Sequence, residues 1–346
     1  MKLGLLISGE YAVAEAVRLA VLAEAEGYDH AWFADERFYH EPYGPLALMA
    51  RETRRIRLGP CVTDPYTRHP ALTALAAATL DEISDGRAVC GLGAGKSGLP
   101  ELGMERKQAA LALKEATLLI RQLLTGQVVS FEGETTWFHD GRLNLPARPD
   151  LPIYIASTGT SPLTAAVAGE VADGVILAFC GTPISLAPAL RRVEAGLARS
   201  GRLRSDLEVV VRLDSAVAAD GSAARDALRP VITRMLYRQR ENLTAYLAPY
   251  GVAVPEAWAE RLRTTVYRGH SREPGALDGL ARELPDEALA PFTLAGTPDE
   301  VAAQVRSLQQ LGVDHVIVQP KTPAGSSVDE VVRLCARSIR PQAERA

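Results

Sequence analysis

The chain has 346 residues, 47% of them hydrophobic and 23% charged, which is enough to bury one large core or two modest ones. Its formal net charge of −4 gives no electrostatic basis for binding nucleic acid or an anionic membrane surface. No run approaches the roughly 20 apolar residues of a membrane-spanning helix, and the apolar run at the N-terminus is too short for a signal peptide. The four cysteines (61, 90, 180 and 335) form no CxxC pair. We therefore expect reduced thiols, no structural metal and a cytoplasmic protein.

Eight apolar runs are typical of strands, and nearly all are continuous, as in strands covered on both faces. They span residues 3–8, 30–35, 56–63, 87–95, 153–157, 174–179, 207–218 and 315–320. Helical patterns lie between them. Eight strand–helix units predict an α/β fold of the (β/α)8 TIM-barrel type in one domain, residues 1–346, whereas fewer strands would indicate an open doubly wound sheet.

Several predicted helices have recognisable ends. A helical pattern over residues 13–26 stops at Gly27, which suits a C-terminal cap. Ser161 before Pro162 predicts an N-cap for a helix that runs to residue 171. Thr297, followed by Pro298 and with Glu300 three residues on, predicts a capping box.

Two connections are too long for plain barrel units. After a predicted helix over 105–124, residues 127–145 have the pattern of a short β-hairpin following the fourth strand. Almost a hundred residues separate the seventh and eighth strands, and they include an insertion at about 237–291. We expect this insertion to act as a lid or a substrate wall.

Residues 56–98 carry the strongest functional signal. A β-branched strand ends at Thr63-Asp64, a helix follows, and a second strand ends in a run of glycines before Lys96. Ligands of parallel α/β proteins lie at the C-terminal ends of strands, so both ends should face the same ligand. The glycine run departs from a P-loop by one residue, and its GxGxxG spacing falls on the fourth strand. Gly93 and Gly95 therefore indicate close approach of the backbone to a planar ring or a phosphate, or else a structural turn.

Other strand ends carry polar residues. Gly159, Thr160 and Ser161 precede a helix and could cradle a phosphate or form an ordinary turn. Asp35 and Glu36 end the second strand and could do acid–base work or form a loop salt bridge, for instance with Arg37.

Further polar residues stand near the strand ends or in the insertion. His69 suits a hydrogen bond at a helix start better than catalysis. Arg212 and Asp214 share a face of the seventh strand, as an ion pair or as a substrate contact. Tyr267, Arg268 and His270 are weaker candidates for substrate contact.

A family resemblance rests on several of these segments. They are LGPCVTDPYTRHP at 58–70, LDEISDGR at 80–87, GLGAG at 91–95, PIYIA at 152–156 and AGEVADGV at 168–175. The chain resembles the luciferase-like superfamily of flavin and deazaflavin (coenzyme F420) enzymes, and within it F420-dependent methylenetetrahydromethanopterin reductases.

The resemblance implies a barrel that binds F420 at its C-terminal face, often as a homodimer. It also implies a non-proline cis peptide at Cys61–Val62 that backs the deazaflavin ring. Together with the glycine run, it predicts cofactor-binding roles for one set of residues. These are Asp35, Cys61, Val62, Thr63, Gly93, Gly95, Ser157, Gly159 and Thr160.

The chain departs from the family pattern at three positions. Leu6 stands where the methanopterin enzymes have an acid, Lys96 where F420 enzymes tend to have Asp or Glu, and Glu36 where a sugar-phosphate branch has His. Since Lys96 reverses the local charge, the proton donor does not carry over from the family.

We therefore predict an F420-dependent oxidoreductase that transfers a hydride to an activated C=C, C=N or C=O bond of a small-molecule or peptide substrate. Lys96, Glu36 and Glu10, in that order, are the candidates for supplying the proton. The alternatives are an FMN-dependent two-component monooxygenase and a non-catalytic barrel that binds a flavin-like ligand.

Overall fold

The computed structural model describes residues 1–95, 98–158, 161–267 and 275–340. The strands are β1 (Lys2–Ile7), β2 (His30–Phe33), β3 (Arg57–Pro60), β4 (Cys90–Leu92), β5 (Val129–Glu132), β6 (Trp137–Gly141), β7 (Ile153–Thr158), β8 (Gly174–Ala178), β9 (Glu208–Val217), β10 (Thr293–Gly296) and β11 (His315–Pro320). The longer helices are α1 (Val13–Ala25), α2 (Tyr43–Glu52), α3 (Pro70–Ile83), α4 (Ala109–Leu123), α5 (Pro162–Val171), α6 (Pro183–Ser200), α7 (Gly221–Tyr237), α9 (Glu256–Thr264), α11 (Pro298–Gln310) and α12 (Val328–Ile339). The shorter α8 (Leu243–Leu247) and α10 (Asp278–Glu283) complete the α-helices of the described residues.

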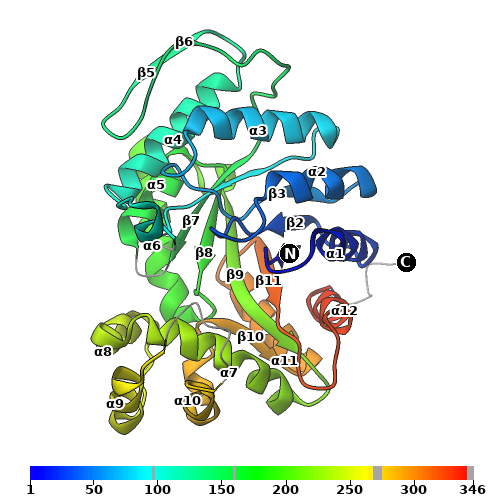
Figure 1. Ribbon diagram of the computed structural model, residues 1–346, viewed down its shortest axis with the longest axis vertical. Coiled ribbons are helices and arrows are strands. Elements are labelled where there is room, and N and C mark those ends of the chain that lie inside the picture. Colours follow the sequence, from blue (N-terminus) through cyan, green and yellow to red (C-terminus); the bar gives the residue numbers. More distant parts are fainter. Residues whose placement is uncertain (96–97, 159–160, 268–274, 341–346) are drawn as a thin grey trace.

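The predicted TIM barrel is confirmed. Parallel strands follow one another in the order β3-β2-β1-β11-β9-β8-β7-β4. Isolated bridges from Leu58 to Ala88 and from Thr63 to Leu92 link β3 to β4, so the ring of eight strands nearly closes. Figure 1 shows the helices wrapped around these strands, with the β5–β6 hairpin at one end of the molecule and α8, α9 and α10 at the other.

Some boundaries differ from the sequence prediction. β3 ends at Pro60 and β4 at Leu92, because the chain turns at Cys61–Val62 and the glycines then leave the sheet. The helix predicted from residue 105 begins at Ala109. β10 was not predicted; its four buried residues pair with the part of β9 that extends beyond β8. The sequence pattern of this short strand was overlooked because the capping box and helix of α11 follow it directly.

The predicted caps have different outcomes. Gly27 lies just past α1 with φ +84°, and Thr297 with Glu300 forms the capping box of α11. The predicted position of Ser161 is confirmed, with Pro162 at the first helical position and α5 ending at Val171. Ser161 is the N-cap residue of α5, but its hydroxyl makes no cap hydrogen bond and instead pairs with the hydroxyl of Thr158 at 3.0 Å.

Alternate strand residues point into the barrel and fill it in layers. A middle layer of Leu6, Trp32, Ile176, Val210 and Ile317 is at most 4% exposed, which seals the interior. The rest of the apolar core lies between the strands and the surrounding helices. Within the described residues no helix is long and apolar enough to cross a membrane.

The N-terminal end of the barrel holds two buried histidines. His30 stacks on Trp32 and lies 4.6 Å from the ring of His315. His315 Nδ1 lies 3.0 Å from a carboxylate oxygen of Glu208, and both nitrogens of His30 are without a hydrogen-bond partner among the described residues. Burial lowers the pKa of both histidines, so both are neutral near pH 7.

These shifts predict a loss of stability in mild acid. A histidine whose pKa is lowered by folding binds its proton more readily when unfolded, so stability is complete above about pH 6.5 and falls below it. Burial acts against the charge of Glu208, but His315 and Lys2 outweigh it and lower that pKa to about 2, so its contribution is lost only in strong acid. Urea unfolding from pH 7.5 to 5.5 should show a falling free energy of unfolding, with a limit of about 1.4 kcal/mol per pH unit per histidine.

His30→Leu should flatten this dependence, whereas the exposed His139→Gln should leave it intact. An unchanged slope in His30→Leu would show that His30 is not a source of the acid sensitivity.

Candidate active site

The C-terminal mouth of the barrel is lined by small side chains. The inward-pointing positions above the sealed layer include Ser8, Ala34, Cys61, Gly93, Ala156 and Ala178. Cys61, Ala156 and Ala178 are half-buried, in contrast to the fully buried layer beneath them. The barrel therefore opens at this end, where a parallel α/β protein places its ligands.

The chain turns at the mouth through the Cys61–Val62 peptide, which is cis as the resemblance implies. The N–H of Cys61 donates to the carbonyl of Phe33 at 2.8 Å, and the N–H of Thr63 donates to the carbonyl of Gly91 at 3.0 Å. This segment is thus fixed to β2 on one side and to β4 on the other. Burial raises the pKa of the Cys61 thiol to about 12, so Cys61 offers a neutral surface and not a thiolate.

The glycine run has a local role that the sequence did not reveal. A Cβ added to Gly93 would lie 2.3 Å from Cγ2 of Val62, and one added to Gly91 would lie 2.3 Å from the carbonyl oxygen of Pro60. Val62 is therefore the group that approaches Gly93. Gly95 has no atom within 4 Å of an added Cβ and is exposed.

Carboxylates follow β2 and β3. The alternative of a loop salt bridge from Asp35 or Glu36 to Arg37 is not what the structure has, because Arg37 pairs with Asp64 at 2.7 Å. Asp64 also accepts hydrogen bonds from the backbone of Tyr66 and Thr67, so its carboxylate serves the turn after β3 and not a ligand. Burial raises the pKa of the half-buried Asp35, while the Thr63 hydroxyl acts in the opposite direction. Of these two carboxylates, Asp35 is the one left for a ligand.

Glu36 stands at the rim of the mouth among charges from several elements. Partial removal of Glu36 from water raises the pKa of its carboxyl most, and the negative charge of Glu10 raises it further. Arg212, Lys321 and Arg238 act against this rise. A carboxyl with a raised pKa retains its proton to higher pH, which suits a proton donor.

Arg212 and Asp214 form the ion pair that was one of the two sequence interpretations. Their closest atoms are 3.4 Å apart, and Lys321 after β11 lies 3.7 Å from the other oxygen of the buried Asp214. The guanidinium of Arg212 also lies 5.5 Å from the centre of the Phe179 ring. Lys321 and Phe179 are site residues that the sequence did not single out. The sequence did hold a signal for Lys321, because it directly follows the strand predicted at 315–320.

The turn after β7 uses its own hydroxyls. Ser157 is buried, and its hydroxyl lies within hydrogen-bond distance of the carbonyls of Thr158 and Ser161. Its side chain therefore stabilises the turn. The predicted residues Lys96, Gly159 and Thr160 lie outside the described residues.

His69 has the structural role that the sequence favoured. Its Nδ1 accepts the N–H of Ala71 at the start of α3, so Nε2 carries the proton and donates to the carbonyl of Trp137 at 3.0 Å. Both nitrogens are thus occupied in joining α3 to the β5–β6 hairpin. Among the described residues there is no cluster of His, Cys, Asp and Glu that could hold a metal ion.

A barrel with an open C-terminal mouth and an acid at its rim is typical of ligand-binding (β/α)8 proteins. Comparison with known proteins narrows this class. The family model for luciferase-like monooxygenase matches residues 1–315, and the chain belongs to this family.

Relatives of known activity match nearly the whole chain. A 5,10-methylenetetrahydromethanopterin reductase of Archaeoglobus fulgidus is 32% identical, covering 93% of this chain and 93% of that one. An F420-dependent glucose-6-phosphate dehydrogenase of Intrasporangium calvum is 30% identical over 92% of each chain. The solved coenzyme F420-dependent tetrahydromethanopterin reductase of Methanopyrus kandleri superposes with a TM-score of 0.85 at 26% identity, covering 97% of both chains.

The packing of Val62 against Gly93 predicts a sharp difference between two glycine substitutions. Gly93→Ala should lower the free energy of unfolding by about 1–3 kcal/mol, because the stiff Val62 side chain must move. Gly95→Ala should change it by no more than about 0.5 kcal/mol. Both substitutions reduce the freedom of the unfolded chain alike, so their difference in urea unfolding reports the contact with Val62. Equal stability of the two variants would contradict this packing.

Proposed function

We propose that the protein is an F420-dependent oxidoreductase that transfers a hydride between the deazaflavin and an activated C=C, C=N or C=O bond of a small-molecule or peptide substrate. The observation that carries the proposal is the open mouth itself, where small inward side chains and the neutral Cys61 thiol leave an uncharged space for a planar ring. Two proteins that match more than 90% of the chain are named as F420-dependent, the glucose-6-phosphate dehydrogenase and the solved tetrahydromethanopterin reductase. Together with the 5,10-methylenetetrahydromethanopterin reductase, they support the choice of cofactor.

The mouth suits a planar ring. Small inward side chains leave room above the sealed layer, and Cys61 and Val62 offer an uncharged surface for one face of the ring. The buried side-chain carbonyl of Gln319 has no hydrogen-bond partner among the described residues, so it is available to a bound N–H or O–H group. When bound, F420 supplies or accepts the hydride.

The chain's own residues then have separate tasks. Asp35 and Thr63 would hold polar edges of the ring, and Gly93 keeps Val62 in place beneath it. The backbone of Gly95, with Ser157 and the residues Gly159 and Thr160 predicted from the sequence, would contact the phosphate side. Glu36 holds a proton at the rim, where its raised pKa suits donation.

The segment at 237–291 is proposed as the substrate-side wall. Its helices have their own apolar core, which includes Tyr250 and Trp258 and is joined by Phe292, the residue just after the segment. Phe292 contacts Phe179 at a ring distance of 5.8 Å, and Phe179 in turn lies under Arg212. The wall therefore reaches the mouth through aromatic contacts.

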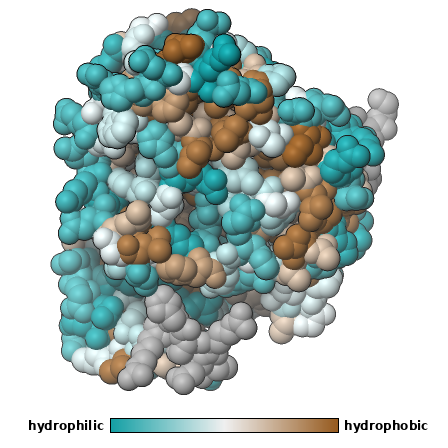
Figure 2. Space-filling view, turned by 45° about the horizontal axis from the view of Figure 1, so that its top comes forward, coloured by the Kyte–Doolittle hydropathy of each residue, from teal (hydrophilic) through white to brown (hydrophobic). Residues whose placement is uncertain are grey.

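We also propose a homodimer in the cytoplasm. Leu48 on α2 and Leu72 and Leu75 on α3 are 41–54% exposed, which provides an apolar surface for a second copy. Figure 2, in which the α3 side of the molecule comes forward, shows exposed apolar groups among hydrophilic ones. The four cysteines are free thiols, as suits a reducing compartment.

The cofactor assignment predicts selective binding. Purified protein titrated separately with F420 and with FMN, and followed by fluorescence, should bind F420 at micromolar concentration or better and FMN at least about tenfold more weakly. Gly93→Ala should weaken F420 binding more than Gly95→Ala does. Binding of FMN alone would support a two-component monooxygenase, and binding of neither would support a non-catalytic barrel.

The role of Glu36 predicts a linked pair of pH profiles. With an acceptor that reoxidises reduced F420, Glu36→Gln should lower kcat about 100-fold, as expected for a lost general acid. Glu10→Gln should retain activity but lose it at lower pH than wild type. The reason is that Glu10 raises the pKa of Glu36, so removing Glu10 lowers that pKa and the acid form is lost earlier as the pH rises. Full activity of Glu36→Gln together with inactive Lys96→Met would assign the proton to Lys96.

A further inference from the structure

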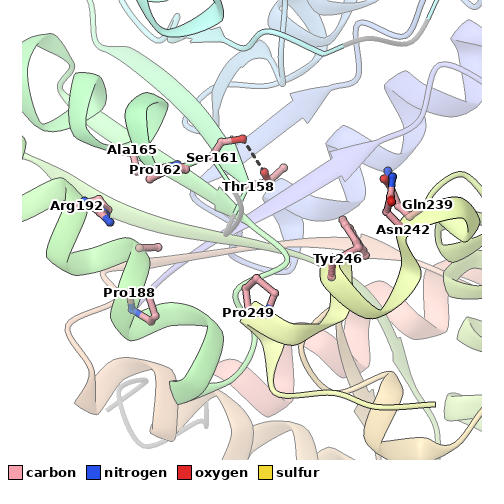
Figure 3. Close-up of a pocket in the computed structure, with 12 residues that line it drawn as sticks. Thr158, Ser161, Pro162, Ala165, Pro188, Arg192, Gln239, Asn242, Tyr246 and Pro249 are labelled. Carbon is pink, nitrogen blue, oxygen red and sulfur yellow. Dashed lines mark hydrogen bonds between the residues drawn. The ribbon is translucent and has the colours of Figure 1, made fainter. Parts of the chain in front are cut away.

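A second pocket of about 500 Å³ opens beside the barrel mouth, between α5, α6 and the segment that follows α7. In Figure 3, Arg192 and Pro188 of α6 stand on one side, and Gln239, Asn242 and Tyr246 stand on the other. The start of α5, with Ser161 and Pro162, closes a third side.

The pocket favours an anion. Arg192 is the only charged residue among the described residues that line it, and no carboxylate does so. Arg192 makes no ion pair or hydrogen bond with any other described residue, so its charge is available. A ligand with a negative charge would thus meet one cation and no repelling group.

The start of α5 adds to this preference. Ser161 is the N-cap residue but leaves the helix end without a side-chain cap, because its hydroxyl bonds to Thr158. Pro162 has no N–H, and the N–H of Ser161 donates to the carbonyl of Thr158, so this end of the ten-residue helix contributes its positive dipole to the pocket and no N–H from these two residues.

The remaining polar lining residues can form hydrogen bonds with the amide groups of a peptide-like ligand. The side-chain amides of Gln239 and Asn242 both donate and accept hydrogen bonds, and neither is engaged within the described part of the protein. Between them and Arg192 the walls are formed by proline and alanine side chains at 162, 165, 188, 189, 245 and 249. A ligand here can combine peptide-like groups with a terminal carboxylate.

The pocket adjoins the strand end at the mouth. Thr158 is the last residue of β7 and shares the inward face with Tyr154 and Ala156, and it also lines the pocket. A ligand that leaves the mouth along β7 therefore enters this pocket next.

We propose that the pocket binds the oligoglutamyl tail of F420, with Arg192 as the residue that pairs with a tail carboxylate. This inference rests on the proposed function. Beyond its phosphate, F420 carries glutamates joined by amide bonds, and these match the amides, the cation and the uncapped helix end of the pocket.

The test separates the tail from the ring. Wild type, Arg192→Met and Arg191→Met are titrated with F420 and with the phosphate ester of its deazaflavin riboside (called the riboside below), which keeps the phosphate and lacks only the tail. Arg191 is the matched control, since it is an exposed neighbour on α6 that does not line the pocket. Arg192→Met should raise the Kd for F420 about fivefold, the upper end for an exposed ion pair, and leave the Kd for the riboside unchanged. Arg191→Met should change neither.

A second variant tests the pocket without altering charge. Ala245→Trp places a large side chain in the pocket from an exposed position, and it should weaken F420 but not the riboside. Added salt should weaken F420 binding to wild type more than to Arg192→Met.

The outcomes are distinct. Equal effects of Arg192→Met and Arg191→Met, or equal weakening of the riboside and F420, would overturn the tail assignment while leaving the cofactor proposal intact. If wild type binds neither ligand, the proposed function itself fails.

Discussion

The close approach of β3 and β4 is the contact on which the mouth of the barrel depends. Val62 occupies the space that a side chain on Gly93 would need, and the Pro60 carbonyl does the same at Gly91. Only glycine at these two positions of β4 and its extension lets the chain after β3 turn inward. The glycines are therefore needed first for packing, and the surface they create is what a ligand would meet.

The side chains inside the barrel differ in size and polarity from its N-terminal to its C-terminal end. At the N-terminal end, two neutral histidines and Glu208 fill the space with polar groups, and the layer above them is sealed by large apolar side chains. Towards the C-terminal end the inward residues become small, with Arg212 and Gln319 as the long exceptions. Rigid packing below and open space above are what a site for a planar ligand requires.

The sequence predicted the barrel because continuous apolar runs and capping residues are local signals. It could not predict that Arg37 would pair with Asp64, since both partners lie in loops whose meeting depends on the closed barrel. Ser157 shows the same limit: strand periodicity placed it at the right strand end but did not reveal that its hydroxyl would serve the turn. Lys321 and Phe179 were missed because their place at a strand end gains meaning only when β9 brings Asp214 to Lys321 and Arg212 to Phe179. The cis peptide was predicted only through the family resemblance, since nothing in the local pattern requires it.

The insertion after β9 has a consequence for how such a protein diversifies. Its core of aromatic and leucine side chains is separate from the core of the barrel, and β10 and the Phe179–Phe292 contact join the two. Substitutions inside this insertion can therefore accumulate without disturbing the packing beneath the mouth. A single cofactor-binding barrel could thus acquire new substrates through changes confined to this one separately packed wall.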